Sequence, residues 1–255
     1  MEAVWRGTLP LTQLSGYRGP GCHTWGRTIP RLLVMEGPAR RNEAERWLTT
    51  KTPVALTGLP DLFRRLAEVE WRGEWIRRDT IDLARSLLDI GLWHAYERMM
   101  RTYHRSRTGA ADEQSVRREA ARCRELVRVF AGVLALHTDY SVAESLDRLD
   151  RVEKIRNPEF EKVLFENSAC DYCLSHQAEY ATGVYVPMTD DMADAICAQA
   201  GRRDVAELPR PRDRRQDMRA SSHPLRDFAP VAVMRTAARY GELMSRAAVL
   251  TEGLR

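Results

Sequence analysis

Two cysteines and a histidine, at positions 170, 173 and 176, have the residue types and spacing best suited to chemistry. A pair of thiolates three residues apart, followed by an imidazole three residues later, can supply three zinc ligands from one helical turn and its exit. The fourth ligand would come from elsewhere in the chain: Cys197, Cys22 or His23. A single CxxC is more often a pair of small core residues, and a redox pair is a third alternative. Cys170, Cys173 and His176 are therefore candidate zinc ligands, and zinc is the one cofactor that the sequence suggests.

A second set of candidate ligands consists of Asp190, Asp191 and Asp194. This DDxxD spacing lets a helix hold magnesium against a diphosphate, as isoprenoid enzymes do. The sequence has no second, downstream cluster of Asn, Ser and Glu ligands to support such a site. Acidic residues are also common at a helix N-terminus, where we place these three. A small magnesium-dependent helical enzyme that acts on a diphosphate is one alternative function.

The motifs of several common enzyme classes are missing from the sequence. We find no glycine-rich phosphate loop of Walker or Rossmann type, no HExxH and no GxSxG. His94, His104 and His137 lie on helical patterns without acidic neighbours in the sequence, so we interpret each as structural. Whether the chain is an enzyme stays open.

The sequence predicts that the elements that position these residues are helices. The strongest pattern runs from Asp79, the expected N-cap, to His104. Its apolar residues recur every three or four positions, at Ile81, Ala84, Leu88, Leu92, Ala95, Met99 and Tyr103. A second such stripe predicts a helix over about 113–138, through Val116, Ala120, Cys123, Val127, Phe130 and Leu134.

Local start and stop signals predict the shorter helices. Pro60 suits the first turn of one helix, and Asn157-Pro158 ends one helix and starts the next. Ser141-Val-Ala-Glu144 reads as a capping box. We expect the helix after Pro158 to bury Phe160, Val163, Leu164 and Leu174. A helix over 190–200 should end at Gly201 in a left-handed C-cap.

Together these patterns predict an all-α helical bundle of seven to eight helices with an irregular N-terminal segment. Glycine and proline make residues 1–38 irregular, and residues 39–201 form the main bundle. Residues 202–224 are an Arg/Pro-rich loop, and residues 225–255 form a C-terminal helix that packs on the bundle through Phe228, Val231, Met234, Ala238 and Leu243.

The charge distribution limits the kinds of partner. The chain of 255 residues has a formal net charge of +4, and its basic residues are nearly all arginines that alternate with acids at helical spacing. That pattern is typical of a solvated helix surface, so nucleic acid is not the favoured partner. In the 202–224 loop, Arg210, Arg212, Arg214 and Arg215 are candidates for contact with an acidic partner.

The sequence predicts a cytoplasmic protein. It has no apolar run long enough to span a membrane and no signal-peptide pattern at Met1. Its five cysteines are an odd number and scattered, which does not suit a disulfide framework.

The order of segments resembles the C-terminal helical domain of alpha-N-acetylglucosaminidases, glycoside hydrolases that remove terminal N-acetylglucosamine. In that family a helix with an Ala-Trp pair precedes a helix with the pattern Tyr-Asp-Leu-x-Asp-x-x-Arg. This chain has Glu45-Arg-Trp47 and then Asp79, Asp82 and Arg85 at the same spacing. Two shorter matches follow, at Phe165-Glu-Asn-Ser-Ala-Cys170, which lacks the family's Arg and Trp, and at Leu225-Arg-Asp-Phe-Ala229.

The resemblance implies a helical domain that packs on a catalytic barrel and helps to wall its substrate cleft. The barrel and its catalytic glutamates are not in this sequence, so no catalytic residue carries over to a position here. Our first expectation is therefore an accessory or stand-alone helical domain that acts through a protein partner or a carbohydrate. The alternatives are a helical interaction module with a structural zinc, which binds an acidic partner or nucleic acid, and the diphosphate enzyme described above.

Overall fold

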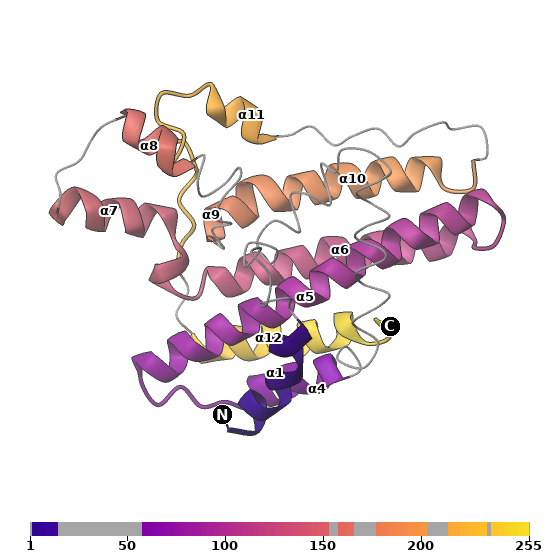
Figure 1. Cartoon of the computed structure of the whole chain (residues 1–255), viewed down its shortest axis with the longest axis horizontal. Helices are drawn as coiled ribbons and strands as arrows, with labels where there is room; N and C mark the ends of the chain where they lie inside the picture. Colours follow the sequence, from indigo (N-terminus) through magenta and orange to yellow (C-terminus); the bar gives the residue numbers. More distant parts are fainter. Residues whose placement is uncertain are drawn as a thin grey trace.

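The computed structural model describes residues 2–14, 58–152, 158–165, 177–202, 214–233 and 236–254. Every regular element in these ranges is a helix, and eight of the helices have seven residues or more, which confirms the predicted all-α bundle. The elements, labelled in Figure 1, are α1 (Glu2–Leu14), α4 (Leu59–Ala67), α5 (Glu74–Arg107), α6 (Glu113–Leu134), η2 (Thr138–Tyr140), α7 (Val142–Val152), α8 (Pro158–Phe165), α9 (Ala178–Tyr180), η4 (Ala181–Tyr185), α10 (Val186–Gln199), α11 (Arg214–Arg219) and α12 (Ala237–Thr251).

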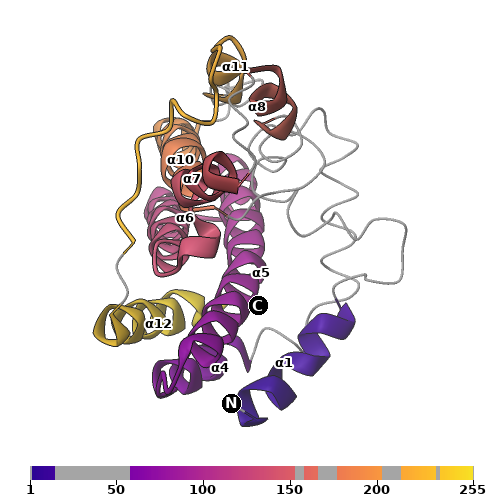
Figure 2. The ribbon, with the colours of Figure 1, turned by 90° about the vertical axis from the view of Figure 1, so that its left-hand side faces the viewer.

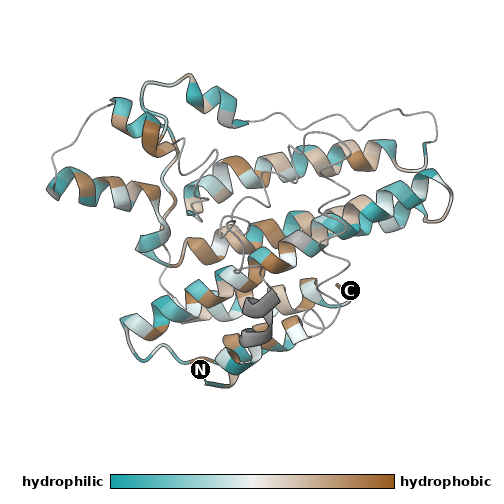
Figure 3. Ribbon diagram, viewed as in Figure 1, coloured by the Kyte–Doolittle hydropathy of each residue, from teal (hydrophilic) through white to brown (hydrophobic). Residues whose placement is uncertain are grey.

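The core forms around α6, which packs against α5, α10 and α12 (Figure 2). Hydrophobic and hydrophilic residues alternate along both α5 and α6, as Figure 3 shows. All residues of the two predicted apolar stripes, from Ile81 to Tyr103 and from Val116 to Leu134, are buried. The stripes are buried because a period of three to four residues places them on one side of each helix.

Helix α5 starts earlier than the sequence predicts. Asp79 is not the N-cap, because the helical hydrogen bonds begin six residues earlier, where the N–H of Arg77 donates to the carbonyl of Gly73 at 3.1 Å. Gly73 is the N-cap residue, and no side chain caps this end. Helix α6 has a side-chain cap, since the carboxylate of Asp112 accepts the N–H of Ser115 at 2.6 Å. This helix ends at Leu134 rather than near 138.

Helix α8 starts at Pro158 as predicted, but the prediction of its buried face is wrong in part. Phe160 and Val163 are exposed, whereas Leu164 packs against the core as predicted, and Leu174 lies outside the described residues. Glu161 and Phe165 are buried instead. Arg226 binds the buried carboxylate of Glu161, because its Nε donates to that carboxylate while its terminal nitrogens bind Asp150 at 3.0 and 3.1 Å. This ion pair offsets the cost of burying the Glu161 carboxylate, which the apolar pattern does not predict.

Asp190 does not start a helix. Helices α9, η4 and α10 follow one another without a break from Ala178 to Gln199, and η4 is one π-helical turn within that run. The end of the run matches the prediction, because Gly201 has a φ of +76°, the left-handed conformation that suits glycine. The three acids therefore lie on the side of a helix rather than at its N-terminus.

The two ends of the chain also differ from the expectation. The segment expected to be irregular contains α1, in which Val4 and Thr8 are buried beside α4. The last helix starts at Ala237 rather than near 225, because Thr236 caps it and accepts the N–H of Arg239. Phe228 lies outside that helix. It is buried all the same, with its ring centroid 4.8 Å from that of Tyr180.

None of the helices in the described ranges is both long enough and apolar enough to cross a membrane.

Candidate interaction site at the start of helix α5

Most of the predicted zinc ligands lie outside the described residues: Cys170, Cys173, His176, Cys22 and His23. Cys197 is partly buried in α10, and burial raises the pKa of its thiol. Among the residues that the structure describes, no three His, Cys, Asp or Glu side chains are placed to hold a metal ion. The zinc site at residues 170–176 stays a prediction.

The three aspartates of the DDxxD motif face arginines. Both carboxylate oxygens of Asp190 accept hydrogen bonds from Arg128 on α6, at 3.0 and 2.8 Å. Arg124, one helical turn before it, binds Asp194 and lies 3.4 Å from Asp190. Asp191 pairs with Arg214 of α11 at 3.4 Å. A magnesium ion would have to compete with these guanidinium groups, and the magnesium site stays a prediction.

Of the four arginines proposed to meet a partner, Arg214 and Arg215 lie in α11. Arg210 and Arg212 lie outside the described residues. Because Arg214 forms an ion pair with Asp191, the positive charge of Arg214 is partly neutralised within the fold.

A set of interacting polar side chains joins the start of α5 to η2. His137 is buried, and its Nδ1 accepts the N–H of Asp139 at 3.1 Å. Nε2 therefore carries the proton of the neutral ring, and it donates to the carboxylate of Glu74 at 2.9 Å. Desolvation alone would raise the pKa of Glu74, but the hydrogen bonds from Arg77 and His137 outweigh it and lower that pKa.

About two turns further along α5 than Glu74, Asp82 and Arg85 bind the same short helix η2. The hydroxyl of Tyr140 donates to Asp82 at 2.8 Å, and Arg85 donates to the same oxygen at 2.7 Å. The guanidinium of Arg85 also lies 5.8 Å from the centre of the Tyr140 ring, within range of a cation–π interaction. Burial, and next the charge of Asp82, raise the pKa of the Tyr140 hydroxyl, so it stays a neutral donor.

Asp139 connects α5 to α7. It accepts from Arg78 at 2.9 Å and from Arg148 at 3.0 Å, and Arg148 also donates to the hydroxyl of Thr138 at 2.8 Å. Desolvation would raise the pKa of Asp139, but the hydrogen bond from Arg148 and the nearby positive charges lower it. The carboxylate is therefore ionised at neutral pH. We call this group of side chains the α5-start cluster: Glu74, Arg78, Asp82, Arg85, His137, Asp139, Tyr140 and Arg148.

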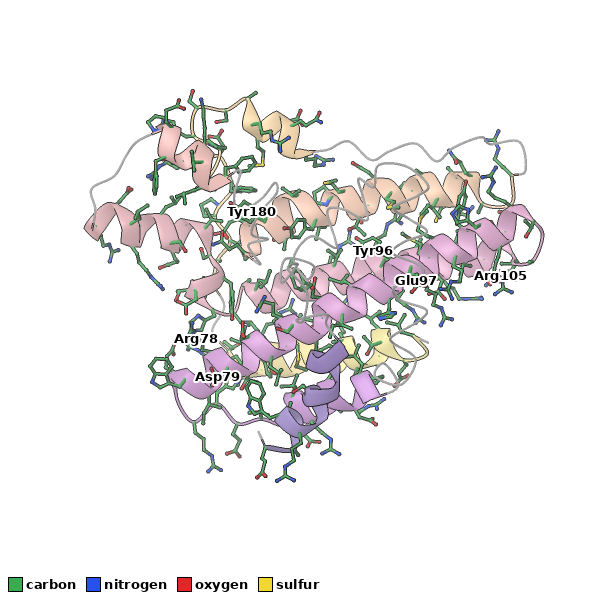
Figure 4. All side chains as sticks on the ribbon, in the orientation of Figure 1. Arg78, Asp79, Tyr96, Glu97, Arg105 and Tyr180 are labelled. Atoms are coloured by element: carbon green, nitrogen blue, oxygen red, sulfur yellow. The ribbon has the colours of Figure 1, made fainter. Side chains whose placement is uncertain are left out.

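Trp75 stands on the first turn of α5, between two members of this cluster, Glu74 and Arg78. Its side chain is 74% exposed, the most exposed large hydrophobic residue in the described ranges. Figure 4 labels Arg78 and Asp79 at this end of the helix. Trp75 therefore presents a large aromatic surface to solvent on a helical turn whose neighbouring side chains are fixed by hydrogen bonds.

Sequence reasoning found part of this site. The spacing of Asp82 and Arg85 was visible, and the structure makes it an ion pair. The pairing of His137 with Glu74 was missed, because 63 residues separate them and no local pattern connects them.

Comparison of the chain with protein-family models, with curated proteins and with solved structures finds no match.

Proposed function

We propose that this chain is an accessory or stand-alone helical domain, similar to the C-terminal domain of alpha-N-acetylglucosaminidase-type glycoside hydrolases, that docks on a protein partner. The observation that carries the proposal is the exposure of Trp75 on the first turn of α5. Tryptophan is enriched among the residues that dominate protein interfaces, where its ring fills a pocket of the partner. A catalytic barrel is the partner that the resemblance implies.

The rigidity of the surroundings supports a docking role for this turn. An aromatic side chain binds more tightly when its backbone is already ordered, because less conformational entropy is lost on association. Glu74 and Arg78, on either side of Trp75, are bound to His137 and Asp139, so the turn is held against η2. Of the residues that carry the resemblance, Asp82 and Arg85 help to hold α5 against η2 in the same way.

Isolation of the partner tests the proposal. The tagged chain would be incubated with a lysate of its source organism, and any retained protein would be identified by mass spectrometry. That protein would then be purified and assayed for hydrolysis of an aryl N-acetylglucosaminide. Support requires a barrel protein that has this activity and binds the chain directly.

Two tryptophan variants make the test specific to the site. Trp75→Ala should weaken binding by about 2 kcal/mol, roughly 30-fold, as for an interface hot spot. Trp5→Ala is the matched control, because Trp5 is also exposed but lies on α1, and it should leave the affinity unchanged. Equal affinities for the wild type and Trp75→Ala would contradict docking at this turn.

A carbohydrate ligand is the other outcome of the test. Tryptophan fluorescence would be followed while an oligosaccharide ending in N-acetylglucosamine is added to the chain alone. A saturable change that is lost in Trp75→Ala would make the chain a carbohydrate-binding module instead of a docking domain.

A further inference from the structure

The other end of α5, where it turns into α6, carries an excess of positive charge. Seven arginines and four carboxylates lie between residues 97 and 122, whereas the whole chain has a net charge of only +4. Figure 3 shows this end of the two helices as hydrophilic. A concentration of charge of one sign is what a charged partner recognises.

Four of these arginines lie on one side of the α5–α6 pair. Arg98 on α5 and Arg122 on α6 both reach the residues that directly follow α12, because Arg98 binds the carbonyl of Gly253 and Arg122 that of Glu252 at 3.0 Å. Seven residues are nearly two helical turns, so Arg105 lies on the same face of α5 as Arg98. Arg118 lies four residues before Arg122 and therefore on the same face of α6. We call Arg98, Arg105, Arg118 and Arg122 the arginine ridge.

Glu119 holds Arg98 and Arg122, the inner two arginines of the ridge. It is buried and accepts from Nε of Arg98 at 2.9 Å, and its other oxygen lies 3.6 Å from Nε of Arg122. The inner arginines, Arg98 and Arg122, therefore have a structural role: they neutralise Glu119 and bind the two backbone carbonyls that directly follow α12.

The outer arginines of the ridge, Arg105 and Arg118, are bound less tightly, although the charge of Arg118 acts on the carboxylate of Asp112. Arg105 donates to the carbonyl of Ala110 at 3.2 Å, and Arg118 donates to the hydroxyl of Ser115 at 2.8 Å. Neither donates a hydrogen bond to a carboxylate of the described residues, and both side chains are exposed. These bonds to neutral oxygens leave several N–H donors of each guanidinium facing solvent. Figure 4 labels Arg105 near the C-terminal end of α5.

We propose that the arginine ridge is a second interaction surface and binds an acidic segment of a protein. Two outer guanidinium groups can each hold one carboxylate in a bidentate pair. Acidic side chains four residues apart lie on the same face of a helix, so one segment can present two carboxylates to the two outer arginines. A nucleic-acid backbone is less suitable, because it needs many cationic contacts and the ridge offers two outer guanidinium groups.

The proposal goes beyond docking at Trp75 and is independent of it. The two surfaces lie at opposite ends of α5, a helix of 34 residues and therefore about 50 Å long. A partner found at one surface does not require a partner at the other.

Binding of labelled probes to the purified chain tests this surface. The probes are a fluorescein-labelled helical peptide with glutamates at every fourth position and a labelled short DNA duplex, and anisotropy is measured at low and at physiological salt. We expect the chain to bind the peptide more tightly than the duplex, and to bind it more weakly as salt screens the charges. Equal or tighter binding of the duplex at physiological salt would overturn the choice of an acidic protein.

Charge reversal locates the binding. Arg105→Glu with Arg118→Glu should weaken peptide binding by at least about tenfold. Arg72→Glu with Arg151→Glu is the matched control, because it makes the same change in net charge at two exposed positions away from the ridge, and it should have a much smaller effect. Circular dichroism checks that both variants are folded. Equal losses in the two variants, or no peptide binding by the wild type, would overturn the proposal.

Discussion

Glu179 caps the N-terminus of α7 from another helix, since its Oε2 accepts the N–H of Val142 at 2.8 Å. Its other oxygen accepts the hydroxyl of Ser141 at 2.7 Å and the N–H of Ala143 at 3.3 Å. The carboxylate is almost completely buried and lies at the positive end of the helix dipole. Glu179 therefore joins α7 to the α9–η4–α10 run.

We expect Glu179→Ala to lower the free energy of unfolding by about 3 kcal/mol, because several buried donors lose their acceptor at once. Glu179→Gln should cost less, since the amide oxygen still accepts one of these bonds. Urea denaturation measures both. Glu144→Ala is the control and should cost under about 0.5 kcal/mol, as expected for a partly exposed position outside this cap. A loss at Glu144 as large as that at Glu179 would contradict this assignment of the cap.

The capping box at the start of α7 shows which contacts the local sequence can predict and which it cannot. Ser141 was correctly predicted to cap α7, and its hydroxyl accepts the N–H of Glu144 at 3.2 Å. The carboxylate bound to this end comes from Glu179, 37 residues after Val142, which no local pattern indicates. The same limit applies to α8, where no local pattern indicates that the distant Arg226 binds the buried carboxylate of Glu161.

Long helices with regular stripes were the most predictable part of the fold. In α5 and α6 the burial of each apolar residue depends only on its place in a helical period, so the sequence contains the information. The start of α5 was not predictable in the same way. Asp79 is a good N-cap residue, but Glu74, the first residue of the helix, contributes through a contact with the distant His137.

The buried carboxyl of Asp89 should make the stability of the chain depend on pH. Asp89 lies on α5, and burial raises the pKa of its carboxyl to about 8, although the charge of Arg85 lowers it. The folded chain therefore keeps this proton up to about pH 8, whereas the unfolded chain releases it near pH 4. Between these values the unfolded state binds fewer protons, so this group makes stability fall as the pH rises, by at most about 1.4 kcal/mol per pH unit.

Asp89→Asn should remove that dependence. The difference in free energy of unfolding between the variant and the wild type should shift in favour of the variant by about 2.5 kcal/mol from pH 5 to pH 7. Urea denaturation at several pH values measures it. The comparison with the wild type cancels the titration of the other groups, and a difference that stays constant with pH would show that Asp89 is ionised in the folded chain.

Substitution of single aspartates in the DDxxD motif should have a small effect on stability, because each is bound to arginines in a partly exposed ion pair. Asp191→Asn breaks one partly exposed ion pair with Arg214 and should change the free energy of unfolding by less than about 1 kcal/mol. Asp190→Asn should cost somewhat more, because both Arg124 and Arg128 lose a partner. Thermal unfolding checks both variants. A wild type that magnesium and diphosphate stabilise together, and an Asp191→Asn variant that they do not, would favour the enzyme alternative.

Elemental analysis decides whether residues 170–176 hold zinc. Purified wild type and Cys173→Ala would be compared by plasma mass spectrometry. A structural zinc site predicts about one zinc per chain in the wild type and its loss in the variant. A zinc content that is the same in both would remove Cys173 from the set of candidate ligands.

Hydrolysis by the proposed partner is the most direct test of a docking domain. The kcat/KM of the isolated barrel protein for an aryl N-acetylglucosaminide would be measured alone, with the wild-type chain and with Trp75→Ala. A domain that completes the substrate cleft should raise kcat/KM, and Trp75→Ala should require a higher concentration of chain for the same effect. If kcat/KM stays the same at saturating chain, the accessory role is wrong.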